Sequence, residues 1–255
     1  MNINEARAVI TGGASGLGNA VARHIVAAGG KVALLDVQDT LGATAAANLG
    51  PAATFIKCDV TNEQSVNDAA QRAHAFLGSI NLTVNCAGVV GAGRMLGKSG
   101  PMAGDFFTKV VHINLIGTFL VDKACANLMT QNAPNADGER GLIIHTSSVA
   151  AYEGQIGQVA YSATKGAVLA MTLPMARELA AFGIRVMTIA PGVFWTPMVD
   201  GMTQDLQDSL AAQVPFPKRL GRAEEYASLV AHLFQSPYMN GEAVRLDGAI
   251  RMQPK

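Results

Sequence analysis

The sequence predicts an α/β fold in which helices cover both faces of a doubly wound parallel sheet. Seven short apolar segments alternate along the chain with longer segments of helical character. The seven segments show no polar–apolar alternation, as expected for strands that are buried on both faces. They span residues 7–11, 31–36, 54–59, 82–86, 142–147, 185–190 and 243–246. No linker divides the 255 residues, so we expect a single domain over residues 1–255.

The segments between the strands carry signals of helix ends and of loops. Thr61 and Gln64 have the spacing of a capping box, which predicts a helix that runs toward Leu77. Gly183 follows the helix that begins near Tyr161, as glycine often does at a helix C terminus. Residues 89–104 are rich in glycine, and residues 132–141 are rich in asparagine, aspartate and proline. Both stretches therefore predict surface loops.

A third stretch, residues 192–220, mixes apolar side chains with prolines and polar residues. Its apolar members include Trp195, Met198, Met202 and Phe216. This composition favours a short helical lid over an apolar pocket, and the alternative is an ordinary connecting segment.

Composition and charge exclude several classes of protein. The chain is 49% hydrophobic and 15% charged, which is typical of a folded domain with a large core. Nineteen basic residues balance nineteen acidic ones, so nothing in the net charge favours a nucleic-acid partner. The apolar runs are much shorter than the ~20 residues of a membrane span. Residues 1–5 lack the basic and apolar regions of a targeting segment, so we expect a cytoplasmic protein.

Cysteine and histidine usage gives no sign of a metal site. The three cysteines have no C-x-x-C spacing, and we expect them to be reduced. The five histidines show no clustering of the kind that metal ligands need.

A glycine-rich turn follows the first predicted strand. It reads Thr11-Gly12-Gly13-Ala14-Ser15-Gly16-Leu17-Gly18 and opens a helix. Such glycines let a pyrophosphate approach the backbone at a helix N terminus, where free amides favour anions. Asp36 ends the second strand eighteen residues after Gly18, where a carboxylate accepts ribose hydroxyls. The alternatives are a structural glycine turn and an ordinary turn aspartate, but the joint spacing favours nucleotide binding.

The same carboxylate distinguishes between the two nicotinamide cofactors. A carboxylate repels the 2′-phosphate of NADP, and NADP sites usually supply an Arg or Lys instead. Neither Ser15 nor Val37 supplies such a cation. The sequence therefore predicts NAD.

Tyr161 and Lys165 lie one helical turn apart on one face of a helix. A nearby ammonium stabilises a phenolate and lowers a tyrosine pKa from about 10, which makes the phenol an acid/base catalyst near neutral pH. Taken alone, this pair is also typical of a solvated helix face. Ser148, at the carboxyl end of the fifth predicted strand, favours a reaction site, because ligands bind at that edge of doubly wound sheets.

Taken in order, these motifs resemble the short-chain dehydrogenase/reductase family, whose members have a Rossmann fold. The likeness spans essentially the whole chain, although Cys86 stands where the common form of the family motif has a second asparagine. The matching residues are Thr11-Gly12-x-x-x-Gly16-x-Gly18, Asn85-Cys86-Ala87-Gly88, Asn114, Ser148, Tyr161 and Lys165.

The resemblance implies a role for each matching residue. Tyr161 is the proton donor or acceptor, Ser148 orients the substrate oxygen, and Lys165 lowers the tyrosine pKa and holds the nicotinamide ribose. Asn114 anchors a proton-relay water, and hydride passes directly to the nicotinamide without a metal. The other residues implied to hold NAD are Thr11, Gly12, Ser15, Gly16, Leu17, Gly18, Asp36, Asp59, Val60, Asn85, Ala87, Gly88, Pro191, Val193 and Thr196.

Within that family, residues 150–158, 213–221 and 245–252 resemble the type 2 3-hydroxyacyl-CoA dehydrogenases. This resemblance implies NAD-dependent oxidation of short or branched 3-hydroxyacyl-CoA in fatty acid metabolism or branched-chain amino acid degradation. Gln155 is then either a contact to the acyl-CoA substrate or part of local loop bonding. The cations near the predicted lid and loops are each more typical of solvated charges than of a CoA phosphate site: Arg94, Lys98, Lys218 and Arg219.

Other functions remain open alongside this one. An NAD-dependent hydroxysteroid or other secondary-alcohol dehydrogenase also suits an apolar lid, whereas Asp36 argues against an NADPH-dependent 3-oxoacyl carrier-protein reductase. Animal relatives also serve in an RNA-processing complex, but the neutral charge and the complete Ser-Tyr-Lys set favour an enzyme. The helix from Tyr161 is apolar nearly all round, and a second apolar face needs a partner. Together with the family resemblance, this predicts a homotetramer.

Overall fold

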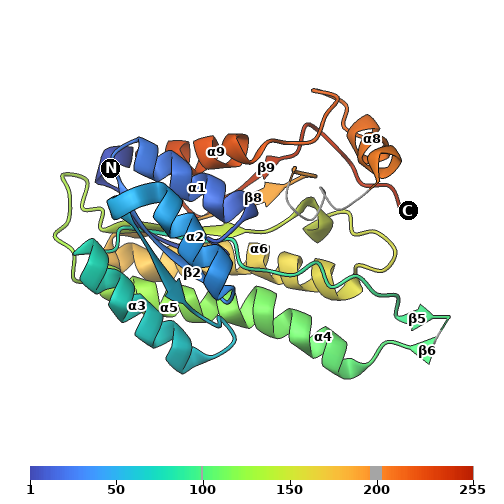
Figure 1. The fold of residues 1–255 in the computed structure, drawn as a ribbon, viewed down its shortest axis with the longest axis horizontal. Coiled ribbons are helices and arrows are strands. Elements are labelled where there is room, and N and C mark those ends of the chain that lie inside the picture. Colours follow the sequence, from blue (N-terminus) through green and yellow to red (C-terminus); the bar gives the residue numbers. More distant parts are fainter. Residues whose placement is uncertain (99, 196–202, 255) are drawn as a thin grey trace.

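Seven parallel strands form the central sheet of the computed structural model, which describes residues 1–98, 100–195 and 203–254 (Figure 1). The strand order is β3-β2-β1-β4-β7-β8-β9, and every adjacent pair is parallel. The strands are β1 Arg7–Thr11, β2 Lys31–Asp36, β3 Ala53–Lys57, β4 Leu82–Asn85, β7 Gly141–Thr146, β8 Ile184–Pro191 and β9 Ala243–Leu246. The chain builds outward from β1 to one edge and then from β4 to the other. The predicted doubly wound fold is confirmed.

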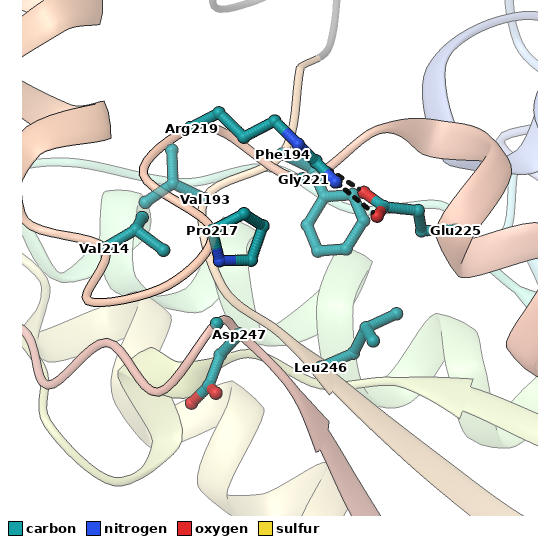
Figure 2. Close-up of a pocket in the computed structure, with 10 residues that line it drawn as sticks. Val193, Phe194, Val214, Pro217, Arg219, Gly221, Glu225, Leu246 and Asp247 are labelled. Atoms are coloured by element: carbon teal, nitrogen blue, oxygen red, sulfur yellow. Dashed lines mark hydrogen bonds and ion pairs between the residues drawn. The ribbon is translucent and has the colours of Figure 1, made fainter.

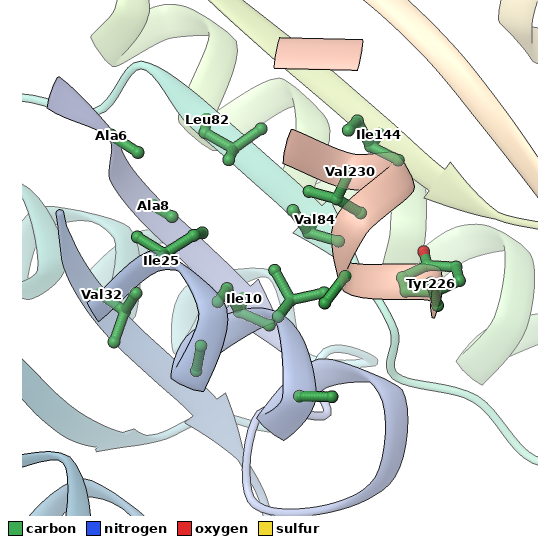
Figure 3. Packing of buried hydrophobic residues seen from close by; sticks show 14 of the residues in the cluster. Ala6, Ala8, Ile10, Ile25, Val32, Leu82, Val84, Ile144, Tyr226 and Val230 are labelled. Carbon is green, nitrogen blue, oxygen red and sulfur yellow. The ribbon is translucent and has the colours of Figure 1, made fainter. Parts of the chain in front are cut away.

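Helices pack on both faces of the sheet because successive strand residues point to opposite sides. Ile10 of β1 joins a core under α1 (Gly16–Ala27), α2 (Asp39–Leu49) and α9 (Ala223–Gln235), part of which Figure 3 shows. Its neighbour Val9 joins a second core under α3 (Glu63–Leu77), α5 (Gly117–Met129) and α6 (Val159–Leu179). The two cores explain why the strands read as unbroken apolar runs.

The remaining elements lie at the ends of this three-layer body. Helix α4 (Gly104–Val111) continues through a π-helical turn (His112–Ile116) into α5. The predicted loop at 89–104 holds a small antiparallel hairpin, β5 (Leu96–Gly97) with β6 (Gly100–Pro101). The predicted lid contains α8 (Gln204–Ala212), while residues 196–202, with Met198 and Met202, lie outside the described residues. Single 3-10 turns cover Ile3–Glu5, Gly50–Ala52, Val149–Ala151 and Ala180–Phe182.

The two predicted helix ends have different outcomes. The capping box at Thr61 is wrong, because α3 begins after Asn62, whose side-chain oxygen accepts the N–H of Ser65 at 2.9 Å. The Thr61 hydroxyl instead donates to the carboxylate of Asp59 at 2.7 Å. The glycine signal is confirmed, since Gly183 follows the 3-10 turn after α6 with a left-handed φ of 71°.

No helix within the described ranges is both long and apolar enough to cross a lipid bilayer.

A fully buried polar network ties the sheet to α5. Asp122 of α5 accepts a hydrogen bond from the Asn85 amide at 2.6 Å and pairs with Nε2 of His145 at 2.8 Å. The other ring nitrogen of His145 lies 3.3 Å from the Thr188 hydroxyl of β8. One carboxylate therefore satisfies polar groups from both β4 and β7, directly below the edge where the functional residues gather.

Replacing that carboxylate should destabilise the fold. Asp122→Ala leaves the Asn85 amide and the His145 ring without their partner in a site that water does not reach, so the free energy of unfolding should fall by about 2–5 kcal/mol. Urea denaturation at one fixed protein concentration measures the change. Asp137→Ala, in the exposed part of the 132–141 loop, is the matched control and should change stability by less than ~0.5 kcal/mol. Equal effects of the two changes would contradict the role given to the network.

Candidate active site

The glycine turn after β1 is packed tightly against the loop that follows β4. Gly12 and Gly16 have left-handed φ values of 61° and 53°. A Cβ on Gly18 would lie 2.5 Å from the carbonyl oxygen of Gly12, and a Cβ on Gly12 would lie 2.9 Å from the backbone nitrogen of Ala87. Side chains at these positions would push the turn out of place. The turn thus has no side chains at these positions, which is what the close approach of a pyrophosphate to the backbone requires.

Helix α1 begins in this turn, so its first amides lie at the carboxyl end of β1. Ser15 is the N-cap residue, and its side chain makes no capping hydrogen bond. Leu17 packs against the first core and holds the start of the helix in place. The uncapped amides and the helix dipole together suit an anionic group.

Asp36 lies at the end of β2 beside the glycine turn. Its carboxylate accepts the N–H of Ala14 at 3.2 Å and the N–H of Gln38 at 3.1 Å. Lys57, the neighbour of Asp36 on β3, is paired with Asp39 at 2.5 Å. Asp36 is therefore held beside the glycine turn, and the adjacent Lys57 already has its own carboxylate partner.

The residues predicted after β3 and β4 differ in what they can offer a ligand. Asp59 is exposed, and its carboxylate accepts the Thr61 N–H at 2.9 Å. Val60 is buried against Gly117 of α5. The side chain of Asn85 points into the core toward Asp122, so only its main chain remains for a cofactor.

Ala87 and Gly88 connect the glycine turn to the reaction end of the site. The N–H of Ala87 donates to the Thr11 hydroxyl at 3.1 Å. A Cβ on Gly88 would lie 3.1 Å from Oδ1 of Asn114 and 3.7 Å from Nζ of Lys165. The loop after β4 therefore touches both predicted functional regions.

Ser148, Tyr161 and Lys165 come together at the carboxyl edge of the sheet, as their spacing predicts. Ser148 begins the turn after β7, and its hydroxyl accepts the N–H of Ala150 at 3.1 Å. The same hydroxyl lies near enough to the Tyr161 phenol to lower its pKa. The Nζ atom of Lys165 lies 5.7 Å from the centroid of the Tyr161 ring and donates to the carbonyl of Thr146 at 2.7 Å. The sequence contained no signal for this carbonyl acceptor.

Burial controls the titration of both groups on α6. It raises the pKa of Tyr161 above its ordinary value, while the nearby Ser148 hydroxyl acts in the opposite direction. Burial also lowers the pKa of Lys165 to about 8. The expectation that Lys165 lowers the Tyr161 pKa is therefore not met by these two side chains alone, because desolvation of the phenol is the larger effect.

Asn114 supports the site from the π-helical turn between α4 and α5. Its side chain accepts the N–H of Val89 at 2.8 Å and donates to the carbonyl of Val89 at 2.9 Å. It also donates to the Thr164 hydroxyl at 3.2 Å. Asn114 thus fastens the loop after β4 to α6, one residue before Lys165, and π turns of this kind often mark functional sites.

The turn after β8 carries the remaining predicted cofactor contacts. Pro191 ends β8, and the N–H of Gly192 donates to the carbonyl of Leu246 at 2.9 Å. The carbonyl of Val193 accepts the N–H of Gly221 at 2.9 Å. Thr196, the last predicted cofactor contact, lies outside the described residues.

Gln155 makes hydrogen bonds of the kind that the second of its two interpretations predicts. Its side-chain amide donates to the carbonyl of Gln253 at 3.1 Å, and its N–H donates to the side chain of Gln158 at 3.0 Å. These bonds assign the amide to local and C-terminal contacts.

Nothing in the sequence indicates a contact among the side chains of Thr146, Tyr226 and Cys86. The Thr146 hydroxyl lies 2.7 Å from the phenol oxygen of Tyr226 on α9 and 3.5 Å from Sγ of Cys86. Burial raises the pKa of the Cys86 thiol and raises that of Tyr226 well above the usual range. Tyr226 is 140 residues from Cys86 in the chain, so no local pattern links them.

A cavity of about 120 Å³ lies next to the turn after β8 (Figure 2). Phe194 and Leu246 give it an apolar wall, and a two-pronged ion pair between Arg219 and Glu225, with distances of 2.7 and 2.8 Å, borders it. Ser148 and Tyr161 are not among its lining residues, so the reacting carbon is not assigned to this cavity.

Fold and site together define an oxidoreductase with a Rossmann fold. The chain belongs to the short chain dehydrogenase family, whose model matches residues 6–207. Dehydrogenases of this family generally use NAD or NADP.

Known proteins show the same likeness over nearly the whole chain. The chain is 50% identical to 3-hydroxyacyl-CoA dehydrogenase type-2 of Bos taurus, over 97% of this chain and 95% of that one. It is 46% identical to the protein of that name in Drosophila melanogaster, over 99% of this chain and 100% of that one. A crystal structure of 3-hydroxyacyl-CoA dehydrogenase type-2 from Mycobacterium avium has a TM-score of 0.95 at 41% identity, over 99% and 98% of the two chains.

Proposed function

We propose that this protein oxidises short or branched 3-hydroxyacyl-CoA to 3-oxoacyl-CoA with NAD. The observation that carries the proposal is the grouping of Ser148, Tyr161 and Lys165, in a chain that is 50% identical to a 3-hydroxyacyl-CoA dehydrogenase over nearly its full length. A dehydrogenation site needs one group for the alcohol proton and one place for the hydride acceptor, and the carboxyl edge of this sheet offers both.

Tyr161 takes the proton of the 3-hydroxyl group as its oxygen becomes a carbonyl oxygen. Ser148 holds that oxygen by donating a hydrogen bond, and the ammonium of Lys165 stabilises the phenolate form of Tyr161. NAD, when bound, would accept the hydride that leaves C3, and its oxidised ring would add positive charge to the site. We infer that this added charge is needed, because burial by itself raises the pKa of Tyr161.

The acyl chain and the remote CoA moiety are expected to bind on the side of residues 150–158 and of the proposed lid at 192–220. Trp195 and Phe216 support this placement, since their side chains are 46% and 81% exposed at the two ends of the lid. Exposed aromatic side chains beside a site suit an apolar acyl group. The same surface supports the alternative of a hydroxysteroid substrate.

We also propose that the chain forms a homotetramer. Phe119 on α5 and Leu173 and Val159 on α6 are large apolar side chains that are 44–52% exposed, on the face of the sheet that carries both helices. Association of copies would cover them, and the mass in solution by light scattering decides the state.

Removing the phenol oxygen should abolish turnover. Tyr161→Phe should lower kcat by a factor of about 10²–10⁴ or more and leave the dissociation constant for NAD within about twofold, since the glycine turn and Asp36 are untouched. Steady-state kinetics and fluorescence titration measure the two quantities. Tyr238→Phe, at a fully exposed position, is the matched control and should keep full activity. Turnover near the wild-type rate in Tyr161→Phe would rule out the proton-transfer role.

The carboxylate of Asp36 should set the choice of cofactor. Wild type should prefer NAD over NADP, and Asp36→Ala should reduce that preference about tenfold, or about 1.4 kcal/mol, by removing a like charge from the 2′-phosphate position. The ratio of kcat/KM with the two cofactors measures the preference, and Asp68→Ala, an exposed aspartate on α3, should leave it unchanged. Equal wild-type efficiency with NADP would defeat this assignment.

Thioesters should be the best substrates. We expect kcat/KM to be far higher for 3-hydroxybutyryl-CoA and 2-methyl-3-hydroxybutyryl-CoA than for free 3-hydroxybutyrate, because contacts to the CoA moiety supply binding energy that orients the reacting carbon. A free acid loses those contacts and also brings an unpaired carboxylate to an apolar surface. All compounds are compared at one pH and one NAD concentration. If a steroid or a free acid outperforms both thioesters, the acyl-CoA substrate assignment is wrong, while the assignment as a dehydrogenase stands.

A further inference from the structure

The segment after β9 lies against the loop that connects Ser148 to Tyr161. We call residues 152–158 the substrate loop and residues 247–254 the C-terminal segment. The N–H of Ile156 donates to the carbonyl of Pro254 at 3.0 Å, and the Gln155 amide donates to the carbonyl of Gln253 at 3.1 Å. The side chain of Ile250 is fully buried. The two segments are therefore fastened along their length.

Ile250 also connects three parts of the site. It forms a small apolar cluster with Val149, which follows Ser148, and with Val214 of the proposed lid. A Cβ on Gly248 would lie 2.5 Å from Val214, and the N–H of Phe216 donates to the carbonyl of Gly248 at 3.4 Å. The C-terminal segment thus packs between the lid and the residues that carry Ser148.

Arg245 of β9 is the charged centre of this arrangement. Its guanidinium donates to both carboxylate oxygens of Glu153 in the substrate loop, at 2.7 and 2.9 Å, and to Asp247 at 2.8 Å. It also donates to the carbonyl of Ile250 at 3.1 Å and lies 4.7 Å from the ring centroid of Tyr152. Two parallel N–H···O bonds fix an arginine and a carboxylate in both distance and orientation.

The surrounding charges are balanced and mostly withdrawn from water. The side chains of Arg245, Glu153 and Asp247 are 21%, 25% and 8% exposed. Arg251 adds a second cation, 3.2 Å from Asp247 and 3.5 Å from Glu153. The hydrogen bonds from Arg245 lower the pKa of Glu153, so its carboxylate remains ionised through the neutral range.

The turn after β8, on the proposed cofactor side, is joined to β9 by the backbone as well as through Asp247, which Arg245 contacts. The turn after β8 is joined to this region by the backbone bond from Gly192 to Leu246 and by the close packing of Gly192 on Asp247. Loss of the guanidinium would remove the side-chain link to the substrate loop and keep the backbone link to the nicotinamide side.

We propose that Arg245 is a positioning residue for the substrate side of the site. Through Glu153 it holds the substrate loop against the C-terminal segment. Ser148 precedes the substrate loop and Tyr161 follows it, so this contact keeps their spacing around the hydroxyl group of an acyl-CoA. The inference rests on the proposed dehydrogenase function and adds a residue that acts through the loop.

Arg245→Met is the main test, because methionine keeps an apolar stem over Tyr152 and removes every N–H donor. We expect KM for 3-hydroxybutyryl-CoA to rise about tenfold or more, while the dissociation constant for NAD stays within about twofold. Glu153→Gln should have a similar effect, and the double variant should be no worse than the poorer single variant, because both changes break one interaction. Arg245→Lys should recover part of the loss, since an ammonium cannot bond both oxygens in the same way.

Hydrogen–deuterium exchange supplies a readout that needs no substrate. Amides of residues 152–158 should exchange about tenfold faster or more in Arg245→Met, with no change in β1 or β4. Arg185→Lys is the matched control. Arg185 pairs with Glu139 at 2.6 Å at the opposite end of β8, so this variant should lose stability without changing KM or exchange in the substrate loop.

Three results would overturn the proposal. One is unchanged KM and unchanged loop exchange in both Arg245→Met and Glu153→Gln. Another is a rise in the NAD dissociation constant equal to the rise in KM, which would indicate a general structural role. A third is wild-type protein that oxidises no acyl-CoA, which removes the proposed function; faster exchange confined to residues 152–158 would then show a clamp without the substrate role assigned here.

Discussion

The close contact between the turns after β1 and β4 is the constraint on which the rest of the site depends. The Thr11 hydroxyl accepts the N–H of Ala87 at 3.1 Å, and the backbone at Gly12 leaves no room for a Cβ at this contact. Gly88 then places the same loop against Asn114 and Lys165. Because β1 and β4 are adjacent where the strand order reverses, one short loop connects the nucleotide end to the reaction end.

Burial sets the direction in which the pKa values of Tyr161 and Lys165 shift. Desolvation opposes the charged form of both groups, so it raises the pKa of Tyr161 and lowers that of Lys165 to about 8. The Thr146 carbonyl accepts a hydrogen bond from Nζ of Lys165 at 2.7 Å, and this nitrogen lies 5.7 Å from the centroid of the Tyr161 ring. Ionisation of the Tyr161 phenol therefore has to overcome this desolvation.

Sequence patterns predict those features of the molecule that depend on near neighbours. The seven strands, the glycine turn and the Tyr161–Lys165 pair follow from local periodicity and spacing, and the structure contains all of them. Prediction from the sequence fails where a partner far away in the chain determines whether a side chain is buried and paired. Glu139 belongs to a predicted surface loop, yet it is buried in an ion pair with Arg185, 46 residues away. The direction of the Tyr161 pKa shift likewise depends on how deeply the fold buries the phenol, which spacing on a helix does not reveal.

The two sides of the site are held by different kinds of structure. The glycine turn, Asp36 and Ser148 lie at or directly after the ends of strands, whereas Asn114, Tyr161 and Lys165 lie on helical segments. All of these residues fall within the residues 6–207 that match the family. The substrate loop is instead fastened by Arg245, Ile250 and the backbone of Gln253 and Pro254, which lie beyond that range. The paired strands and the helices packed on them hold the first group in place, because the same elements build the two cores. Ile250 packs in a separate small cluster with Val149 and Val214, so the substrate loop is fastened apart from the two cores that hold the first group.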